Sequence, residues 1–98
     1  MSKCVKYIER NDLTGATHLE VMVYYTKGGG TIRRGYYISL KPVTKYNGTI
    51  SYVMYTGRRQ LLLETSRYSD KQFAQAVEMA REFEDELIAA VVEENMAA

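Results

Sequence analysis

Hydrophobic and polar residues alternate along the first two thirds of the chain, up to about Ser69, and short glycine-containing segments separate the alternating runs. A period of two residues is typical of antiparallel strands joined by hairpins. The pattern predicts strands over residues 3–9, 18–26, 31–45, 49–56 and 59–65, the first of which has the weakest alternation.

After Ser69 the period changes to that of a helix. Apolar residues recur at helical spacing at Phe73, Val77, Ala80, Leu87 and Val91. Ser69 is a good N-cap, and Gln72, three residues later, completes the pattern of a capping box. We therefore expect one helix over about residues 70–94. The predicted fold of the 98-residue chain is a single α+β domain: a four- to five-stranded antiparallel sheet, built as a meander of hairpins, with one long C-terminal helix packed on one face.

Three turn signals predict how the strands pair. Lys27–Gly30 reads as a four-residue loop that places Tyr25 opposite Ile32. Asn47-Gly48 is typical of a type I′ hairpin, and Gly57-Arg58 suits a type II′ hairpin. This last turn places Met54 opposite Leu61 and Tyr52 opposite Leu63.

Pro42 stands where the first and second hairpins give conflicting faces, because Leu40 and Val43 would otherwise point to opposite sides of the sheet. Proline within sheets is confined to edges and bulges. We therefore expect a bulge near Pro42 that returns Val43 to the helix side. The other face is then uncovered and carries His18, Glu20, Met22, Tyr24, Arg33, Tyr37, Lys41, Val53, Tyr55, Gln60 and Leu62.

Charge is distributed unevenly along the chain. Residues 1–69 hold 11 basic and 4 acidic side chains, residues 70–98 hold 2 and 8, and all nine tyrosines lie in the first segment. Cations that follow phosphates and rings that stack on bases are the features of single-strand binding surfaces. The residues expected to bind nucleic acid are Tyr24, Arg33, Tyr37, Lys41, Tyr55, Arg58 and Arg59. A structural interpretation also exists, because tyrosine favours strands and basic residues protect sheet edges.

No catalytic pattern is present, and we expect a protein that is not an enzyme. His18 has no partner at a spacing that supports acid–base catalysis, and Cys4 is the only cysteine. We therefore expect no metal and no cofactor. The glycines after Lys27 lie between strands rather than at a helix start, which argues against a Walker loop. The first ten residues lack a secretory signal and no apolar run is long enough for a membrane span, so a cytoplasmic location is expected.

The expected helix is longer than a compact domain of this size and should project beyond the sheet. Its last part is apolar nearly all round, and a second chain would shield it from water. We therefore expect a homodimer whose interface includes Leu87, Ile88, Val91 and Val92. The alternative is that the last turns fray.

The succession of basic antiparallel strands and one long C-terminal helix resembles the Whirly and positive-cofactor single-stranded-DNA-binding domains. The resemblance covers about residues 18–95, including the segments RRGYYISLKPV and RRQLLLETSRYS. It implies dimeric, sequence-tolerant binding of single strands on the sheet, with Arg33, Tyr37 and Lys41 as the first positions to test.

Together these features favour a non-enzymatic protein that binds nucleic acid, single-stranded DNA or RNA in particular. The alternative is a protein-binding regulator or inhibitor of the mobile-element type. In that case the acidic helix would imitate nucleic-acid charge with Glu82, Glu84, Asp85, Glu86, Glu93 and Glu94. More commonly such residues form the solvated side of a helix.

Overall fold

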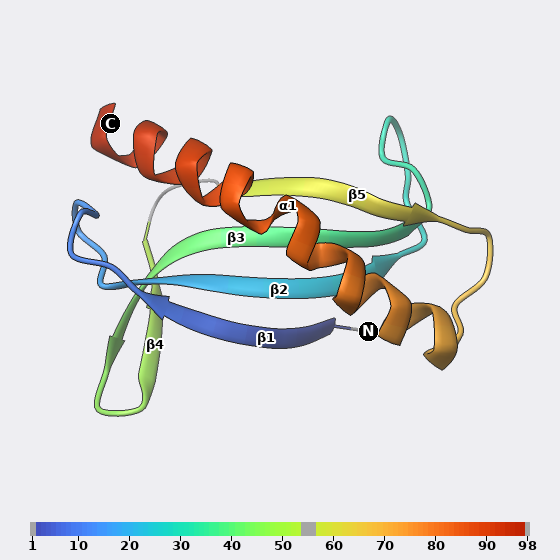
Figure 1. The fold of residues 1–98 in the computed structure, drawn as a ribbon, viewed down its shortest axis with the longest axis horizontal. Coiled ribbons are helices and arrows are strands. Elements are labelled where there is room, and N and C mark those ends of the chain that lie inside the picture. Colours follow the sequence, from blue (N-terminus) through green and yellow to red (C-terminus); the bar gives the residue numbers. More distant parts are fainter. Residues whose placement is uncertain (1, 54–56, 98) are drawn as a thin grey trace.

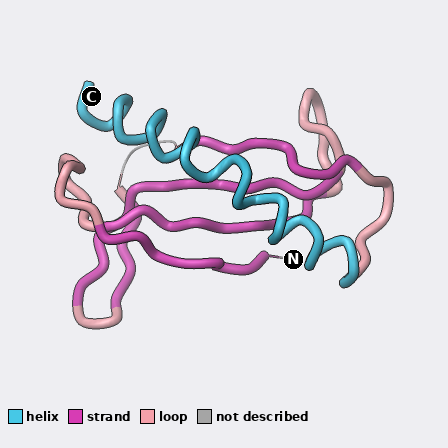
Figure 2. The backbone as a smooth tube through the Cα atoms, viewed as in Figure 1, coloured by secondary structure: helices cyan, strands magenta, loops and turns pink. Residues whose placement is uncertain are grey.

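The computed structural model describes residues 2–53 and 57–97. In chain order it contains β1 (Ser2–Glu9), β2 (His18–Thr26), β3 (Gly35–Tyr46), β4 (Thr49–Tyr52), β5 (Arg58–Glu64) and α1 (Asp70–Ala97). The strands form one antiparallel sheet, and α1 lies diagonally across one face of it (Figures 1 and 2). The predicted α+β class, with one long C-terminal helix on an antiparallel sheet, is confirmed.

The order of strands differs from a simple meander at its last step. β1 pairs with β2 and β2 with β3, but the far edge of β3 is shared between two partners. β5 pairs with Gly35–Leu40, and β4 pairs with Val43–Tyr46. The two strands therefore lie end to end along one edge of β3 (Figure 1).

The predicted hairpin at Gly57-Arg58 is consequently wrong. Leu63 pairs with Tyr36 of β3 rather than with Tyr52, and the predicted partner of Leu61, Met54, lies outside the described residues. Gly57 packs so closely on β3 that a Cβ atom there would overlap the carbonyl of Leu40. The glycine therefore permits a close backbone approach instead of making a turn.

The hairpin between β2 and β3 turns two residues later than predicted. Gly29 and Ile32 form a bridge through two backbone hydrogen bonds of 3.0 and 2.9 Å, so the tip is Gly30-Thr31. Tyr25 accordingly lies opposite Tyr36, not Ile32. This moves the register by four residues. Because four is an even number, the side chains of β2, and those of β3 as far as Lys41, keep their predicted faces.

The Asn47-Gly48 turn is confirmed. Both residues have positive φ, 49° and 78°, as a type I′ turn requires, and Tyr46 pairs with Thr49 across it.

The bulge predicted at Pro42 is absent. The register between β2 and β3 continues without a shift through the pair Leu19 and Pro42. On the other side of β3, the partner changes from β5 to β4 at Lys41 and Pro42, and neither residue has a paired neighbour there among the described residues. A proline is tolerated where the ladder is interrupted. The consequence is that Val43 stays on the face opposite Leu40.

The core lies between α1 and the sheet. Small helix residues, Ala76 and Ala80, let the helix approach the sheet closely, and both are buried. The sheet contributes Leu19, Val21, Val23, Tyr36, Ile38, Leu40 and Leu62. Leu62, predicted on the uncovered face, joins the core because β5 pairs with β3 rather than with β4. Gln60 lies opposite Ile38 on the helix side, and Leu62, two residues later in the strand, shares that face.

Tyr36 holds the start of α1 against the beginning of β3. Its side chain is fully buried; the hydroxyl accepts from the Ser69 amide at 2.9 Å and donates to the Ser69 carbonyl at 3.1 Å. Ser69 Oγ in turn accepts from the Gln72 amide at 3.1 Å, which confirms the predicted N-cap. The rings of Tyr25, Tyr68 and Phe73 surround Tyr36 at centroid distances of 5.1 to 6.0 Å.

The other end of α1 is also fastened rather than projecting freely. Val91 is fully buried by its own chain, and the Asn95 side chain bonds both the amide (2.6 Å) and the carbonyl (3.2 Å) of Thr14. Val91 is therefore unavailable as a dimer contact. Leu87, Ile88 and Val92 are half-buried against the same core, and their role in a dimer stays a prediction.

Replacing Tyr36 with phenylalanine tests the fastening of the helix start. Loss of the hydroxyl leaves the buried Ser69 amide without its partner, so we expect the free energy of unfolding to fall by about 1 to 3 kcal/mol in urea denaturation. Tyr46→Phe is the matched control, because Tyr46 is 73% exposed and should change stability by less than about 0.5 kcal/mol. Equal stabilities of the two variants would contradict the role assigned to Tyr36.

Candidate nucleic-acid interface

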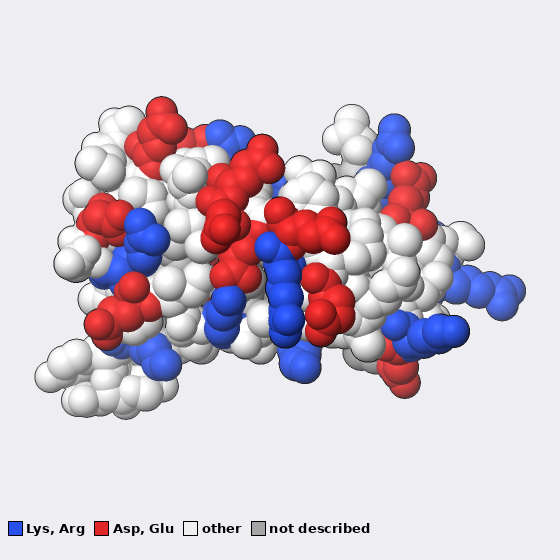
Figure 3. Space-filling view, viewed as in Figure 1, with Lys and Arg blue, Asp and Glu red and all other residues white. Residues whose placement is uncertain are grey.

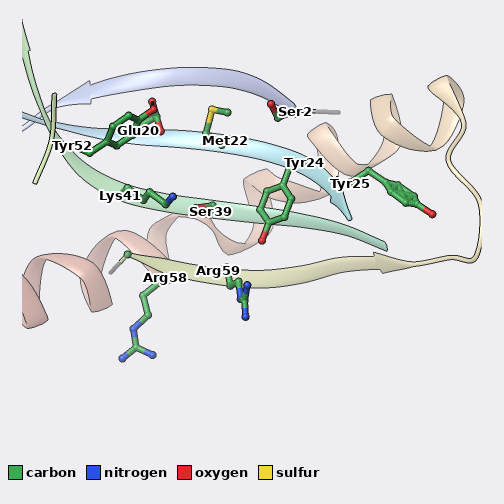
Figure 4. A pocket seen from close by; sticks show the side chains of 11 residues that line it. Ser2, Glu20, Met22, Tyr24, Tyr25, Ser39, Lys41, Tyr52, Arg58 and Arg59 are labelled. Carbon is green, nitrogen blue, oxygen red and sulfur yellow. Dashed lines mark hydrogen bonds between the residues drawn. The ribbon is translucent and has the colours of Figure 1, made fainter. Parts of the chain in front are cut away.

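The face of the sheet opposite α1 contains a pocket of about 660 Å³. Alternate residues of two central strands form its floor: Glu20, Met22 and Tyr24 from β2, and Ser39 and Lys41 from β3. The remaining lining residues are Ser2, Tyr25, Tyr52, Gly57, Arg58 and Arg59. Figure 4 shows the pocket with α1 behind the sheet. We call it the open-face pocket.

Two tyrosines predicted to stack on bases stack on each other instead. Tyr24 and Tyr37 are cross-strand neighbours whose rings are 5.6 Å apart and inclined by 15°. Tyr37 is only 7% exposed, and its hydroxyl donates to the carbonyl of Arg33 at 2.8 Å. Tyr37 therefore supports Tyr24 from within the surface and exposes little of its own ring; its direct contact with a base stays a prediction. Tyr24 is half-buried and lines the pocket.

Lys41 and Arg59 are the two predicted cations that the fold brings to the open-face pocket. Both are exposed, and neither forms an ion pair with another described residue. Ser39 lies between them, since it pairs with Arg59 and precedes Lys41 on β3. Their charges are therefore available to a ligand.

The remaining predicted residues add no further unpaired cation to the pocket. Arg58 lines the pocket, but it forms an ion pair with Glu94 of α1 and points away from the pocket centre in Figure 4. Arg33 pairs with Glu64 at 3.1 Å, beyond the opposite end of β3. Tyr55 lies outside the described residues.

A tyrosine–carboxylate network at one end of the pocket was not predicted. Glu20 is 4% exposed, and its Oε2 accepts from the hydroxyls of Tyr7 at 3.2 Å and Tyr52 at 3.1 Å. Tyr7 comes from β1, whereas Tyr52 comes from β4 and reaches across β3. Tyr52 is 61% exposed. The bulge predicted at Pro42 would instead have placed it on the helix side together with Val43, its partner across the strands. An unbroken alternation through β3 would have placed it correctly.

Two lysines sit on the rings of this network. Lys45 Nζ lies 4.7 Å from the centroid of Tyr7, and Lys41 Nζ lies 5.9 Å from that of Tyr52. These are cation–π distances. The hydrogen bond to Glu20 raises the pKa of Tyr52. A hydrogen bond with Cys4, together with burial and the charge of Glu20, raises the pKa of Tyr7 to about 12.

Acidic residues of α1 neutralise part of the strand charge on the other face. Glu84 pairs with Lys6 of β1 at 2.6 Å, and Glu94 pairs with Arg58 of β5. Figure 3 shows acidic side chains gathered over α1 with basic side chains among and beside them. Ion pairs between the helix and the strands therefore neutralise part of the charge difference between the two segments of the sequence.

The other polar candidates stand apart. The His18 ring bonds the hydroxyl of its neighbour Thr17 at 2.7 Å, and the Cys4 thiol is exposed. Within residues 2–53 and 57–97, no three His, Cys, Asp or Glu side chains gather as a metal site would require. The same residues include no helix with the combination of length and apolar character that crossing a membrane demands.

The raised pKa of Tyr7 predicts a loss of stability at alkaline pH. Between pH about 10, where an unfolded tyrosine loses its proton, and about 12, the folded protein retains the proton, so stability falls as pH rises through this window. Urea denaturation of the parent protein and Tyr7→Phe should show a shallower loss in the variant, with Tyr46→Phe as the control for removing a phenol. Parallel pH profiles for Tyr7→Phe and the parent would contradict the prediction.

Comparison of the chain with protein-family models, curated proteins and solved structures finds no significant match. The resemblance to Whirly and positive-cofactor domains therefore stays a prediction from the arrangement of the sequence.

Proposed function

We propose that the open-face pocket binds single-stranded nucleic acid. The observation that carries this proposal is the combination, around one pocket of about 660 Å³, of two tyrosine rings and two cations without acidic partners among the described residues: Tyr24, Tyr52, Lys41 and Arg59. Aromatic rings stack on bases and cations follow phosphates, and single-strand binding surfaces combine the two.

The support of the two rings favours stacking. Tyr24 rests on Tyr37, and the hydroxyl of Tyr52 is bonded to Glu20. A ring that is already held in place loses little conformational entropy when a base stacks on it, and each stacked base contributes about 1 to 3 kcal/mol. These positions are therefore better suited to binding than flexible exposed side chains would be.

The shape of the surface favours single strands over duplexes. A duplex displays its bases only at the edges within its grooves, and these are usually read by an inserted helix or a β-ribbon. The rings of the open-face pocket instead line a sheet, which suits bases that are unpaired and able to turn their faces toward the protein.

Fluorescence polarisation with single- and double-stranded DNA and RNA at two salt concentrations tests the proposal. We expect single strands to bind more tightly than duplexes, with a log–log salt slope of about −0.7 for each phosphate contacted. Lys41→Ala combined with Arg59→Ala should weaken binding by about tenfold or more and flatten that slope.

The matched control removes two cations from the helix, through Lys71→Ala combined with Arg81→Ala. It changes the net charge by the same amount but leaves the open face intact, so affinity should stay close to that of the parent protein. Equal losses in the two double variants would mean that total charge, and not the pocket, determines binding. Absence of binding to every oligonucleotide would overturn the proposed function.

A further inference from the structure

Glu20 is an unusual residue to find in a pocket proposed to bind a polyanion. Its side chain is 4% exposed, yet no described cation forms an ion pair with it. The amines of Lys41 and Lys45 lie over the rings of Tyr52 and Tyr7. Burying a carboxylate without a cation is costly, and an apolar residue would fill a purely structural position at lower cost.

One oxygen of Glu20 is left for a ligand. Both hydroxyl bonds go to Oε2, and Oε1 accepts no hydrogen bond from the described residues. The described part of the chain has no side-chain oxygen that is both buried and without a hydrogen bond. Oε1 must therefore have some exposure, and Glu20 lines the open-face pocket. A carboxylate oxygen held in place in this way can only accept hydrogen bonds.

The partner that fits Oε1 is an N–H donor next to the exposed ring of Tyr52. Because the Tyr52 hydroxyl contacts Glu20, a base stacked on that ring has its edge beside the carboxylate. We propose that Glu20 selects bases by the donors on their Watson–Crick edge and that it favours guanine. This inference rests on the proposed binding of single strands.

Base chemistry gives the order of preference. Guanine places two donors, N1–H and the N2 amino group, side by side on this edge. Cytosine and adenine have one amino group beside an acceptor nitrogen, and thymine and uracil have one N–H between two carbonyls. A carboxylate attracts the donors and repels the acceptors, so guanine should bind best and thymine or uracil least well.

The first experiment uses the unmodified protein and changes only the ligand. Polarisation is measured with an oligothymidylate and with the same oligonucleotide carrying one central guanine or one central inosine, which lacks the N2 amino group. We expect guanine to increase affinity by about tenfold over thymine, with inosine between them. Because no residue is altered, the result does not depend on the folding of a variant.

The second experiment uses Glu20→Gln, which preserves side-chain size and retains a carbonyl oxygen to accept the two tyrosine hydroxyls. Thermal melting followed by circular dichroism establishes that the variant is folded. We expect the tenfold preference for guanine to shrink to about twofold or less, since the amide has half the acceptors and no charge. Lys45→Gln is the matched control, because it changes charge beside the network but not the acceptor, and it should keep the preference for guanine.

The outcomes separate this inference from the function on which it rests. Tight, salt-dependent binding with equal affinity for the guanine, inosine and thymine ligands would overturn the role of Glu20 and leave the proposed function standing. A preference for guanine that persists in folded Glu20→Gln would likewise assign the selection to another residue. Failure of all three ligands to bind would overturn both proposals.

Discussion

The buried hydroxyl of Tyr36 is the interaction on which the arrangement of the molecule depends. It bonds both backbone groups of Ser69 and so fixes the start of α1 beside the first residues of β3. A buried polar group of this kind is costly when it lacks a partner, which makes the alternative placements of the helix unfavourable. With its start fixed there, α1 covers the face that carries the branched aliphatic side chains and leaves the opposite face without a covering element.

Charged side chains consequently have different partners on the two faces of the sheet. On the helix side, carboxylates of α1 meet cations of the strands, as in the pair of Glu84 with Lys6. On the open side, Lys41 and Arg59 face solvent, and the one carboxylate of the pocket is held by tyrosine hydroxyls. Exposed cations without partners attract anions over a distance of about 10 Å at moderate salt. One face of the folded protein therefore carries unpaired positive charge, although basic and acidic residues nearly balance over the whole sequence.

Much of the fold was predictable because side-chain direction depends only on whether a shift in register is odd or even. The error at the first hairpin was four residues, so Tyr24, Lys41 and Glu20 were still assigned to the correct face. The errors at Pro42 and in β5 were different. The assumed bulge moved Tyr52 to the wrong face, and the assumed pairing of β5 with β4 instead of β3 moved Leu62 to the wrong face. Local sequence does not determine the face of Tyr52 or of Leu62. Both faces depend on which strand lies beside β3, and long-range pairing decides that.

The two hydrogen bonds between the Asn95 side chain and the Thr14 backbone join residues 81 positions apart in the chain. Contacts between such distant segments close a large loop and slow the formation of the native state. During translation the sheet emerges from the ribosome before the helix that covers its apolar face, so contacts such as that of Asn95 with Thr14 form last. Until the helix is in place, that apolar face is exposed, and transiently exposed apolar surface is prone to aggregate.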